Sequence, residues 1–490
     1  MSFDPAQIAA VLPLLVLSLA GCGLLLTDAF TRGRSRGFLM WLALAAVGVA
    51  FILVMVQWRG FESAQTAFGG MVVLDHFALY AQMVFLTGGA LTLLLAPAYL
   101  HEHGLDFGEF YPLVLFALAG MSILAQAGDL VTILLGIETM SLSVYVLTGC
   151  WRRSPKSEEG ALKYYLNGAV ATAFLVYGIA LIYGATGETN LRAIASQAAG
   201  AAGQPTFILG MLLTLVALGF KVAAAPFHMW APDAYEGAPT PVTAFMAAAV
   251  KAAAFVAVLR VLVGALGTTE LKNGSLSWVY VLSGLSVLTM TVGNLAALRQ
   301  ENVKRLLAYS SIAHAGYLLV GVVAAGVVGA EGRAAVLYYL LAYTFTTIGA
   351  FGVVAWIGRR GDERLLLDDW GGLGTRHPAA ALAMTIFLLS LGGIPPTAGF
   401  FGKFYIFKAA LESSALLPLV VIAVLNSVIS IYYYLKVVMV MYFREAGRET
   451  VPLRSAPVTL ALVVAAFFVL QMGLQPGRYL AYAAKSLLGG

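Results

Sequence analysis

Residues 206–229 read TFILGMLLTLVALGFKVAAAPFHM, a membrane-spanning pattern that is interrupted near its end. Apolar and small residues fill the stretch up to Phe220, and Lys221 and then Pro226 follow. About 20 apolar residues cross the hydrocarbon core as a helix, so the stretch predicts a span. Proline lacks a backbone donor and clashes with the preceding turn, so the helix is predicted to break there. Backbone groups freed at that depth need water or polar protein groups beside them.

Apolar runs of similar length recur through the whole chain. Its 490 residues are 60% hydrophobic and only 11% charged, which excludes an ordinary soluble globular protein. The sequence therefore predicts an all-α integral membrane protein with about fourteen transmembrane helices. They are predicted at 8–28, 38–57, 75–97, 111–127, 130–150, 162–184, 206–229, 241–264, 277–297, 303–325, 334–357, 380–408, 416–443 and 457–476.

The connections between the spans leave no room for a soluble domain. The longest, at about 185–205 and 358–379, contain no nucleotide-binding or iron–sulfur motif. Two cysteines, Cys22 and Cys150, make neither a disulfide framework nor a metal spacing. The net charge of +5 is not gathered into a basic patch, so a nucleic-acid partner is not expected. The first span lacks the basic start and the cleavage site of a signal peptide, so we expect it to be retained.

The basic residues of the loops predict an orientation. Loops after even-numbered spans and the C-terminal tail hold six: Arg59, Arg192, Lys272, Arg333, Arg478 and Lys485. Loops after odd-numbered spans hold sixteen: Arg32, Arg34, Arg36, Arg152, Arg153, Lys156, Arg299, Lys304, Arg305, Arg359, Arg360, Arg364, Arg376, Arg444, Arg448 and Arg454. Basic loops stay on the cytoplasmic side, so both termini are predicted on the non-cytoplasmic side.

The sequence contains an internal repeat. Spans four to eight align with spans nine to thirteen; Tyr145 matches Tyr317 and Tyr164 matches Tyr338, at offsets of 172 and 174 residues. Five helices are an odd number, so the second copy must enter the membrane from the opposite face, as in the inverted repeats of transporters. The predicted single membrane domain, 1–490, then divides into segments 1–100, 108–270, 275–445 and 455–490.

The second copy also contains a predicted break. Residues 391–396 read LGGIPP, and Lys403 follows seven residues later. A lysine beside each break would supply donors for the freed carbonyls and a site for a proton. At the repeat offset Lys403 falls opposite Trp230, so Lys221 and Lys403 are equivalent only approximately.

Two charged residues lie too far from the ends of their spans to reach the membrane surface. Lys251 lies about ten residues into the span 241–264, and Glu138 lies about eight residues from either end of its span. A charge at the bilayer centre costs about 2.5–3.5 kcal/mol on the insertion scale, so such residues usually face the protein interior and serve transport. Burial disfavours the charged form of a lysine, which then releases its proton more readily. These residues predict proton transfer.

Each of the other polar residues near the spans fits either a structural role or a role in proton transfer. Lys163, Lys408, Lys436 and Arg260 lie near span ends, where long side chains usually reach the interface. His228 follows Lys221 by seven residues and either shares its helix face or caps a local turn. His314 ends the segment YSSIAH and serves either in a relay or as a hydrogen-bonded structural residue.

Three segments carry a family resemblance: LGIE at 135–138, the run from Lys221 to Pro241, and NVKRLLAYSS at 302–311. Together they resemble the antiporter-like membrane subunits of respiratory complex I, the proton-pumping NADH:quinone oxidoreductase. The resemblance covers spans four to thirteen well. Within this family the chain is most similar to the N-type subunits, because of its length, the lysine at 403 and the lack of a long C-terminal lateral helix.

The resemblance implies roles for particular residues. Glu138, Lys221, Lys251 and Lys403 match the ionisable residues of a proton path at mid-membrane. The candidate accessory residues are Lys163, His228, His314 and Lys436. Related subunits also carry a histidine on helix eight, which this chain lacks, so the route from Lys251 to Lys403 would use water and hydroxyl groups.

The resemblance also implies where the chemistry of the complex takes place. NADH, FMN, the iron–sulfur clusters and the quinone are expected in partner subunits, with no redox centre and no metal in this chain. The expected partners are other antiporter-like and small membrane subunits, the lipid bilayer, protons and water. The implied location is the bacterial inner membrane.

The expected mechanism is electrostatic. A carboxylate near Lys221 favours its ammonium form, and opposite charges 4 Å apart attract by about 4 kcal/mol at an effective dielectric of 20. Separating the pair would drive the proton through water to Lys251 and on to Lys403. A charge or conformational change in neighbouring subunits would supply the energy.

Other functions use similar sequences. One alternative is a subunit of an Mrp-type cation/proton antiporter, which would use the same residues with sodium coupled. A second is a subunit of a hydrogenase-linked membrane complex. A third is a structural scaffold or a quinone-binding subunit, but a scaffold has no need for Glu138 and Lys251 at the midplane.

Overall fold

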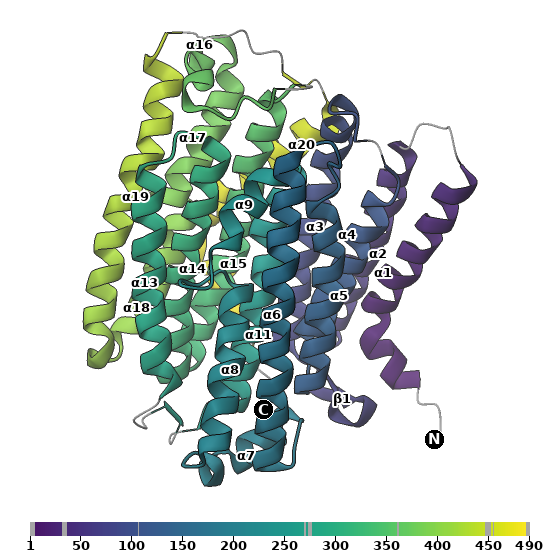
Figure 1. Ribbon diagram of the computed structural model, residues 1–490, viewed down its shortest axis with the longest axis vertical. Helices are drawn as coiled ribbons and strands as arrows, with labels where there is room; N and C mark the ends of the chain where they lie inside the picture. The colour runs from purple at the N-terminus through teal and green to yellow at the C-terminus, as the bar shows by residue number, and fades with distance from the viewer. Residues whose placement is uncertain are drawn as a thin grey trace.

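The computed structural model describes residues 5–31, 37–105, 107–268, 271–272, 277–359, 362–445, 452–453 and 455–486. These residues form a tall bundle of roughly parallel and antiparallel helices (Figure 1). The expectation of an all-α integral membrane protein is confirmed. Six of the loop arginines that predict the orientation lie outside the described residues: Arg32, Arg34, Arg36, Arg360, Arg448 and Arg454.

The first segment packs against one side of the bundle. Its elements are α1 (Pro5–Phe30), α2 (Gly37–Arg59), β1 (Gln65–Ala67), η1 (Phe68–Gly70), β2 (Val72–Leu74) and α3 (His76–Glu102). The two strands form an antiparallel hairpin in which Gln65 pairs with Leu74 and Ala67 with Val72. Asp75 caps α3 by accepting a hydrogen bond from the Ala78 amide at 2.7 Å.

The second segment contains the first broken helix. Its elements are α4 (Phe110–Ala125), α5 (Leu130–Thr148), α6 (Pro155–Thr186), α7 (Leu191–Ala201), α8 (Pro205–Lys221), α9 (Trp230–Gly237), α10 (Thr240–Phe245), η2 (Met246–Val250), α11 (Lys251–Leu259) and η3 (Arg260–Ala265). Asp129 caps α5 through the Val131 amide. The last four elements join into one continuous helix, Thr240–Ala265, and η2 and η3 are π-helical turns within it.

The third segment contains the second broken helix. Its elements are α13 (Trp278–Leu298), α14 (Val303–Val327), α15 (Ala330–Ile357), η4 (Leu367–Trp370), α16 (Leu373–Arg376), α17 (Pro378–Gly392), α18 (Ala398–Leu411), η5 (Ser414–Leu416), α19 (Leu417–Phe443), α20 (Ala456–Leu474) and α21 (Pro476–Ala484). Asn302 caps α14 by accepting from the Arg305 amide at 3.1 Å.

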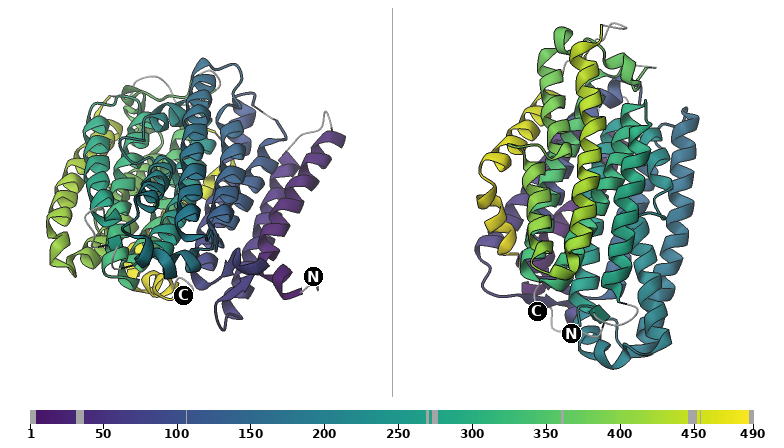
Figure 2. Two further views of the ribbon diagram at one scale, coloured as in Figure 1. Left: turned by 60° about the horizontal axis from the view of Figure 1, so that its bottom comes forward. Right: turned by 90° about the vertical axis from the view of Figure 1, so that its left-hand side faces the viewer.

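Among the described residues, eleven helices are long and apolar enough to cross a membrane. Three shorter apolar helices, α4, α8 and α17, lie at the fourth, seventh and twelfth predicted spans. The start of α1 and the end of α21 lie at the same end of the bundle, opposite α16 (Figures 1 and 2). The count of fourteen crossings and the inverted relation of the two repeats stay predictions.

Both predicted helix breaks are confirmed. Helix α8 ends at Lys221 and α9 begins at Trp230, so the regular helix is lost on both sides of Pro226. Helix α17 ends at Gly392 and α18 begins at Ala398, on either side of the two prolines. At each break a side chain satisfies a freed carbonyl: the Trp230 indole donates to Phe220 O at 3.3 Å, and Lys403 donates to Gly392 O at 3.2 Å.

The helices divide into an inner and an outer group. Helix Thr240–Ala265 is buried inside the chain except at Val263 and Gly264 near its end, and α14 and α15 are also largely buried. Helices α6, α13 and α19 bury much less of their surface, and α19 forms one edge of the bundle in Figure 1. A helix that is apolar on every face is stable when other helices or lipid cover it. Other helices cover the inner group, and the outer group leaves apolar faces for lipid or partner subunits.

Candidate functional site

The first of two lysine clusters lies between α5 and the end of α8. Ser141 and Tyr145 lie three and seven residues after Glu138, so the three side chains share one face of α5. Lys221 donates to the Ser141 hydroxyl at 2.9 Å and to the Tyr145 hydroxyl at 3.3 Å. The donors of Lys221 therefore serve hydroxyls of α5, and the expectation that they serve the carbonyls of its own break is wrong.

Glu138 completes this first cluster. We call Glu138, Ser141, Tyr145 and Lys221 the outer cluster, because it reaches the surface of the chain. Its carboxylate accepts a hydrogen bond from the Thr172 hydroxyl of α6 at 2.6 Å. Glu138 is half-buried, and the large apolar side chains beside it on α5 and α6, such as Leu135 and Leu142, are about half exposed. Both Glu138 and Lys221 are described, and no direct ion pair joins them. Ser141 lies between them on the α5 face.

The second cluster is enclosed by the inner helices. Lys251 is 3% exposed and is the first residue of α11, directly after the π-helical turn η2. Its ammonium donates to Ser311 O at 2.6 Å and also contacts the Ser311 hydroxyl. π-turns occur often at functional sites, because they redirect side chains from the regular helical pattern.

His314 lies on the same helix as Ser311, three residues further along. One ring nitrogen is 2.5 Å from the Tyr339 hydroxyl and the other is 3.0 Å from the Tyr434 hydroxyl. Tyr434 in turn contacts the Ser310 hydroxyl. The imidazole is therefore hydrogen-bonded on both sides by groups that can donate or accept a proton.

Lys403 lies at the far end of this inner cluster. Besides Gly392 O, its ammonium donates to the Ser427 hydroxyl at 2.9 Å and lies 4.8 Å from the centre of the Tyr317 ring. Ser311, His314 and Tyr317 are spaced three residues apart, so they share one face of α14. Lys251 and Lys403 thus both contact α14, at Ser311 and at Tyr317, and His314 lies between these two residues in the helix.

The two clusters are not joined by direct contacts. Lys221 and Lys251 share no hydrogen-bond partner within the described part of the chain. Of the four predicted path residues, the structure brings together Glu138 with Lys221, and Lys251 with Lys403 through α14. Their role in proton transfer stays a prediction.

The accessory residues are more scattered. Lys163 of α6 forms ion pairs with Glu159 at 2.6 Å and with Asp233 of α9 at 2.7 Å, outside the Lys221 cluster. His228 lies in the first break, and its Nδ1 is buried without a hydrogen-bond partner among the described residues. Lys436 is partly exposed on α19, on the same helix as the exposed Tyr432 and Met439.

One basic residue behaves differently from its expectation. The sequence predicts that Arg260 reaches the membrane interface, but it is 4% exposed and forms two hydrogen bonds of 2.7 Å to the Asp75 carboxylate. Its guanidinium also donates to Ala125 O. The expectation is wrong because Asp75, which is distant in sequence, offers a partner of opposite charge inside the protein.

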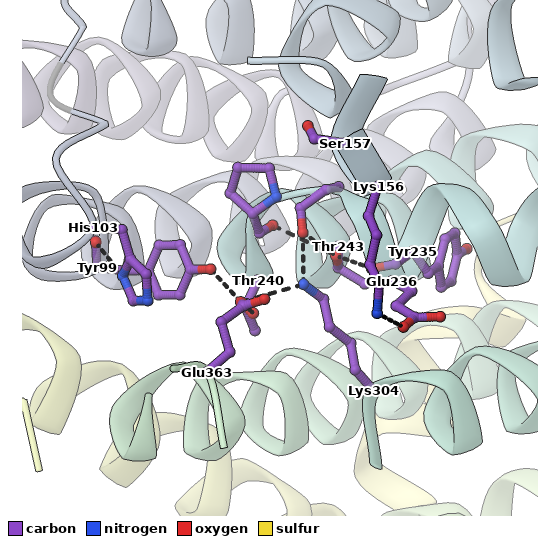
Figure 3. A network of polar contacts seen from close by, with 12 residues as sticks. Tyr99, His103, Lys156, Ser157, Tyr235, Glu236, Thr240, Thr243, Lys304 and Glu363 are labelled. Atoms are coloured by element: carbon purple, nitrogen blue, oxygen red, sulfur yellow. Dashed lines mark hydrogen bonds and ion pairs between the residues drawn. The ribbon is translucent and has the colours of Figure 1, made fainter. Parts of the chain in front are cut away.

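Sequence reasoning missed a polar network at the end of the bundle that carries α16 (Figure 3). Lys304, predicted in a loop, is fully buried in the first turn of α14 and donates to Ala238 O at 2.6 Å. Its ammonium is 3.5 Å from the Glu363 carboxylate. Arg305 joins Asp233 and Glu236 of α9 at 2.8 and 2.9 Å. The available signal was the pair of acids placed between the first break and the next span.

The described residues contain no group of three or more histidine, cysteine or acidic side chains that could hold a metal ion. The arrangement is one of lysines, hydroxyls and one imidazole inside helices. These groups can hold and pass protons, because each can change protonation state or exchange a hydrogen-bonded proton.

The chain is similar to known proteins over almost its whole length. Residues 127–430 match the family described as NADH:quinone oxidoreductase/Mrp antiporter, TM. NADH-quinone oxidoreductase subunit N 1 of Sorangium cellulosum is 50% identical, with 98% of each chain covered. A chain of respiratory complex I from Thermus thermophilus with bound aureothin is 37% identical, with a TM-score of 0.80 over 98% of this chain and 100% of that one.

A chain of the Mrp complex from Dietzia sp. DQ12-45-1b has a TM-score of 0.82 at 22% identity, covering 98% of this chain and 97% of that one. At that identity the likeness shows the fold alone, whereas the Sorangium and Thermus chains are similar in sequence as well as in fold. The chain therefore belongs to the NADH:quinone oxidoreductase/Mrp antiporter family of membrane proteins, among the relatives named NADH-quinone oxidoreductase subunit N.

Proposed function

We propose that this chain is a proton-translocating membrane subunit of NADH:quinone oxidoreductase. The observation that supports it most is the placement of two buried lysines, Lys251 and Lys403, beside the same helix, α14. A lysine costs several kcal/mol to bury unless it is solvated by the protein. Here two buried lysines are placed at either end of a run of hydroxyls and one imidazole, which suits proton transfer better than structural stability.

In this proposal the outer cluster receives the driving signal. Glu138 is half-buried in a surface of exposed apolar side chains on α5 and α6, where a neighbouring membrane subunit would pack. A positive charge arriving near Glu138 would weaken the hold of that carboxylate on the ammonium of Lys221. Lys221 would then release its proton towards Lys251.

The inner cluster carries the proton onwards. A proton reaching Lys251 would make the ammonium that donates to Ser311. Transfer continues through Ser311, His314 and the tyrosine hydroxyls beside it, each group accepting one proton and releasing another. Lys403, whose ammonium donates to Gly392 O and to the Ser427 hydroxyl, receives the proton and later releases it near the second helix break.

The chemistry that drives this transfer belongs to partner subunits in the proposal. NADH, FMN, the iron–sulfur clusters and the quinone would be bound there, and other antiporter-like and small membrane subunits would pack against this chain. The chain would lie in the bacterial inner membrane. The positive-inside rule puts its termini on the non-cytoplasmic side, and protease accessibility of a terminal tag in right-side-out vesicles tests that orientation.

The decisive experiment replaces Lys251 in the complete complex. Lys251→Ala should assemble, because alanine is a good helix former, but proton pumping by the reconstituted complex should fall with the NADH:quinone activity. Lys251→Arg should not restore pumping, because arginine keeps its proton at any physiological pH. Wild-type pumping by Lys251→Ala would remove this residue from the path and with it the core of the mechanism.

A further inference from the structure

The end of the bundle that carries α16 contains an acidic cavity of about 630 Å³. Five carboxylates and two basic side chains line it: Glu236, Asp362, Glu363, Asp368, Asp369, Lys156 and Arg364. The basic loops predict this end to be cytoplasmic. These water-accessible carboxylates are not part of the proposed path from Glu138 to Lys403.

Glu363 is the carboxylate that connects this cavity to the interior. Its side chain is 16% exposed, and it accepts a hydrogen bond from the Thr240 hydroxyl at 3.1 Å and another from Tyr99 (Figure 3). Behind it lies Lys304, which is fully buried. Thr240 is the first residue of the enclosed helix that carries Lys251.

Two other acids of the cavity, Glu236 and Asp369, are as little exposed as Glu363. Asp369 lies 3.9 Å from Arg364 and accepts a hydrogen bond from the Leu366 amide, and Glu236 is fixed in its ionised form. Burial alone would raise the pKa of the Glu236 carboxyl, but hydrogen bonds from Lys156 at 2.8 Å and Arg305 at 2.9 Å outweigh this and hold the pKa below its ordinary value. Two cations therefore keep Glu236 from taking up a proton. Glu363 faces one cation, 3.5 Å away, and two hydroxyl donors.

Helix α14 leads from this point towards Lys251. Lys304 and Ser311 are seven residues apart, which is two helical turns on the same face and about 10 Å along the axis. The side chains of Tyr235 and Tyr343 lie beside Ser311, which accepts the hydrogen bonds of Lys251. The Thr240 hydroxyl beside the cavity and the Ser311 hydroxyl beside Lys251 thus mark the two ends of this interval.

We propose that Glu363 collects protons from the acidic cavity and supplies them to Lys251. This proposal rests on the proposed function and identifies an entrance for its inner cluster. A hydronium ion in the cavity protonates Glu363. The proton then passes by way of Thr240, Tyr235 and Ser311, with water between them, to the neutral amine of Lys251, and Glu363 returns to its carboxylate. Each hydroxyl accepts one proton and releases another, so no charge remains on the way. Lys304, 3.5 Å from the carboxylate, acts as a positioning residue that holds it and is not a step of the transfer.

The test measures NADH:quinone turnover of the complete complex in proteoliposomes, with a protonophore present so that no gradient opposes turnover. Glu363→Gln should slow turnover by about tenfold, a modest loss for a proton-transfer group, and Glu363→Asp should stay near wild type. Formate, a small weak acid, should partly restore Glu363→Gln by bringing protons past the missing carboxylate. Asp368→Asn is the matched control, because Asp368 lines the same cavity and is largely exposed.

Three results would overturn the proposal. The first is wild-type turnover in Glu363→Gln, and the second is a slow Glu363→Gln complex that formate does not accelerate. If Glu363→Gln does not assemble, Thr240→Val removes the hydroxyl while keeping the side-chain volume, and wild-type turnover in that variant is the third. Lys251→Ala measured in parallel separates the two proposals. Turnover that falls in Lys251→Ala but stays normal in Glu363→Gln defeats only the entrance, whereas normal turnover in Lys251→Ala defeats the proposed function.

Discussion

The outer and inner lysine clusters are built from similar groups in different surroundings. Lys221 meets two hydroxyls of α5 beside a half-buried carboxylate, close to exposed apolar surface. Lys251 and Lys403 are 3% and 4% exposed, and other helices cover most of the helix that carries Lys251. The same change of charge has a larger effect where the dielectric is low. The outer cluster is therefore suited to sense a neighbouring subunit, and the inner cluster to hold a proton that water cannot remove.

The largest effect is expected at Lys403. Lys403→Met removes the proton site and leaves Gly392 O without its donor, so pumping should fall by at least about tenfold and the complex should lose about 1–3 kcal/mol of stability. Lys403→Arg should recover the stability but not the pumping, because arginine donates hydrogen bonds without releasing its proton. Pumping of reconstituted complex and its thermal midpoint measure the two effects.

The Lys403 result tests the comparison directly. If Lys403→Met pumps at half the wild-type rate or better, water reaches the inner cluster and the enclosure has no functional meaning. If Lys403→Arg restores pumping as well as stability, Lys403 stabilises the helix break and does not carry protons.

A second, smaller effect is expected from a packing change beside the inner relay. A Cβ at Gly402 would lie 2.0 Å from Cδ2 of Tyr339, whose hydroxyl contacts His314. Tyr339 is 1% exposed and cannot move away, so Gly402→Ala should cost about 1–3 kcal/mol and displace the hydroxyl. Pumping should fall about fivefold, which corresponds to about 1 kcal/mol.

Gly477→Ala is the control for this change, because a Cβ there meets nothing within 4 Å. The measurements are the yield of assembled complex and the ratio of protons pumped to NADH oxidised. A Gly402→Ala complex with reduced stability and a normal ratio would show that the contact between Tyr339 and His314 is dispensable.

Much of the fold could be predicted from the sequence, because the composition of a membrane helix reflects the lipid or protein that surrounds it. Apolar runs indicate the spans, and prolines within them indicate the breaks at Pro226 and Pro395. The burial of Lys251 followed from its distance to the span ends. These are local properties, so no knowledge of neighbouring helices was needed.

The partners of the charged residues could not be predicted in the same way. Lys304 and Glu363 are 59 residues apart, and Arg260 and Asp75 are 185 residues apart. Which helix faces meet depends on the packing of the whole bundle, and no spacing within one helix encodes it. For the same reason Lys221 was expected to serve its own break, whereas its donors reach across to α5.

A moderate effect is expected at the outer cluster from Glu138→Gln. Glutamine can still accept the hydrogen bond from Thr172, so assembly should be unchanged, but the charge near Lys221 is lost. Because Glu138 is half-buried, solvent or a partner subunit screens that charge, and pumping should fall only about two- to threefold, a loss under 1 kcal/mol. The variant is measured beside Lys403→Met in the same proteoliposomes. An equal loss in both would remove the distinction between a screened and an enclosed cluster.

The smallest effect is expected from Gly168→Ala, which repeats the packing change of Gly402 at the outer cluster. The new Cβ would lie 1.9 Å from the Tyr145 hydroxyl, so the phenol must turn away from Lys221. Tyr145 is 8% exposed and packs against Tyr164 on one side, but it has the half-exposed Tyr165 beside it and contacts Gly168 through the hydroxyl end of its ring. Its ring can therefore shift towards Tyr165, and Lys221 keeps its bond to Ser141. Pumping should stay within about twofold of wild type, a loss under 0.5 kcal/mol.

The Gly168→Ala and Gly402→Ala substitutions both press a methyl group onto a tyrosine that contacts a path residue, and they differ in the room around that tyrosine. A loss in Gly168→Ala as large as in Gly402→Ala would mean that the tyrosine contact itself, and not the enclosure of the cluster, sets the sensitivity of proton transfer.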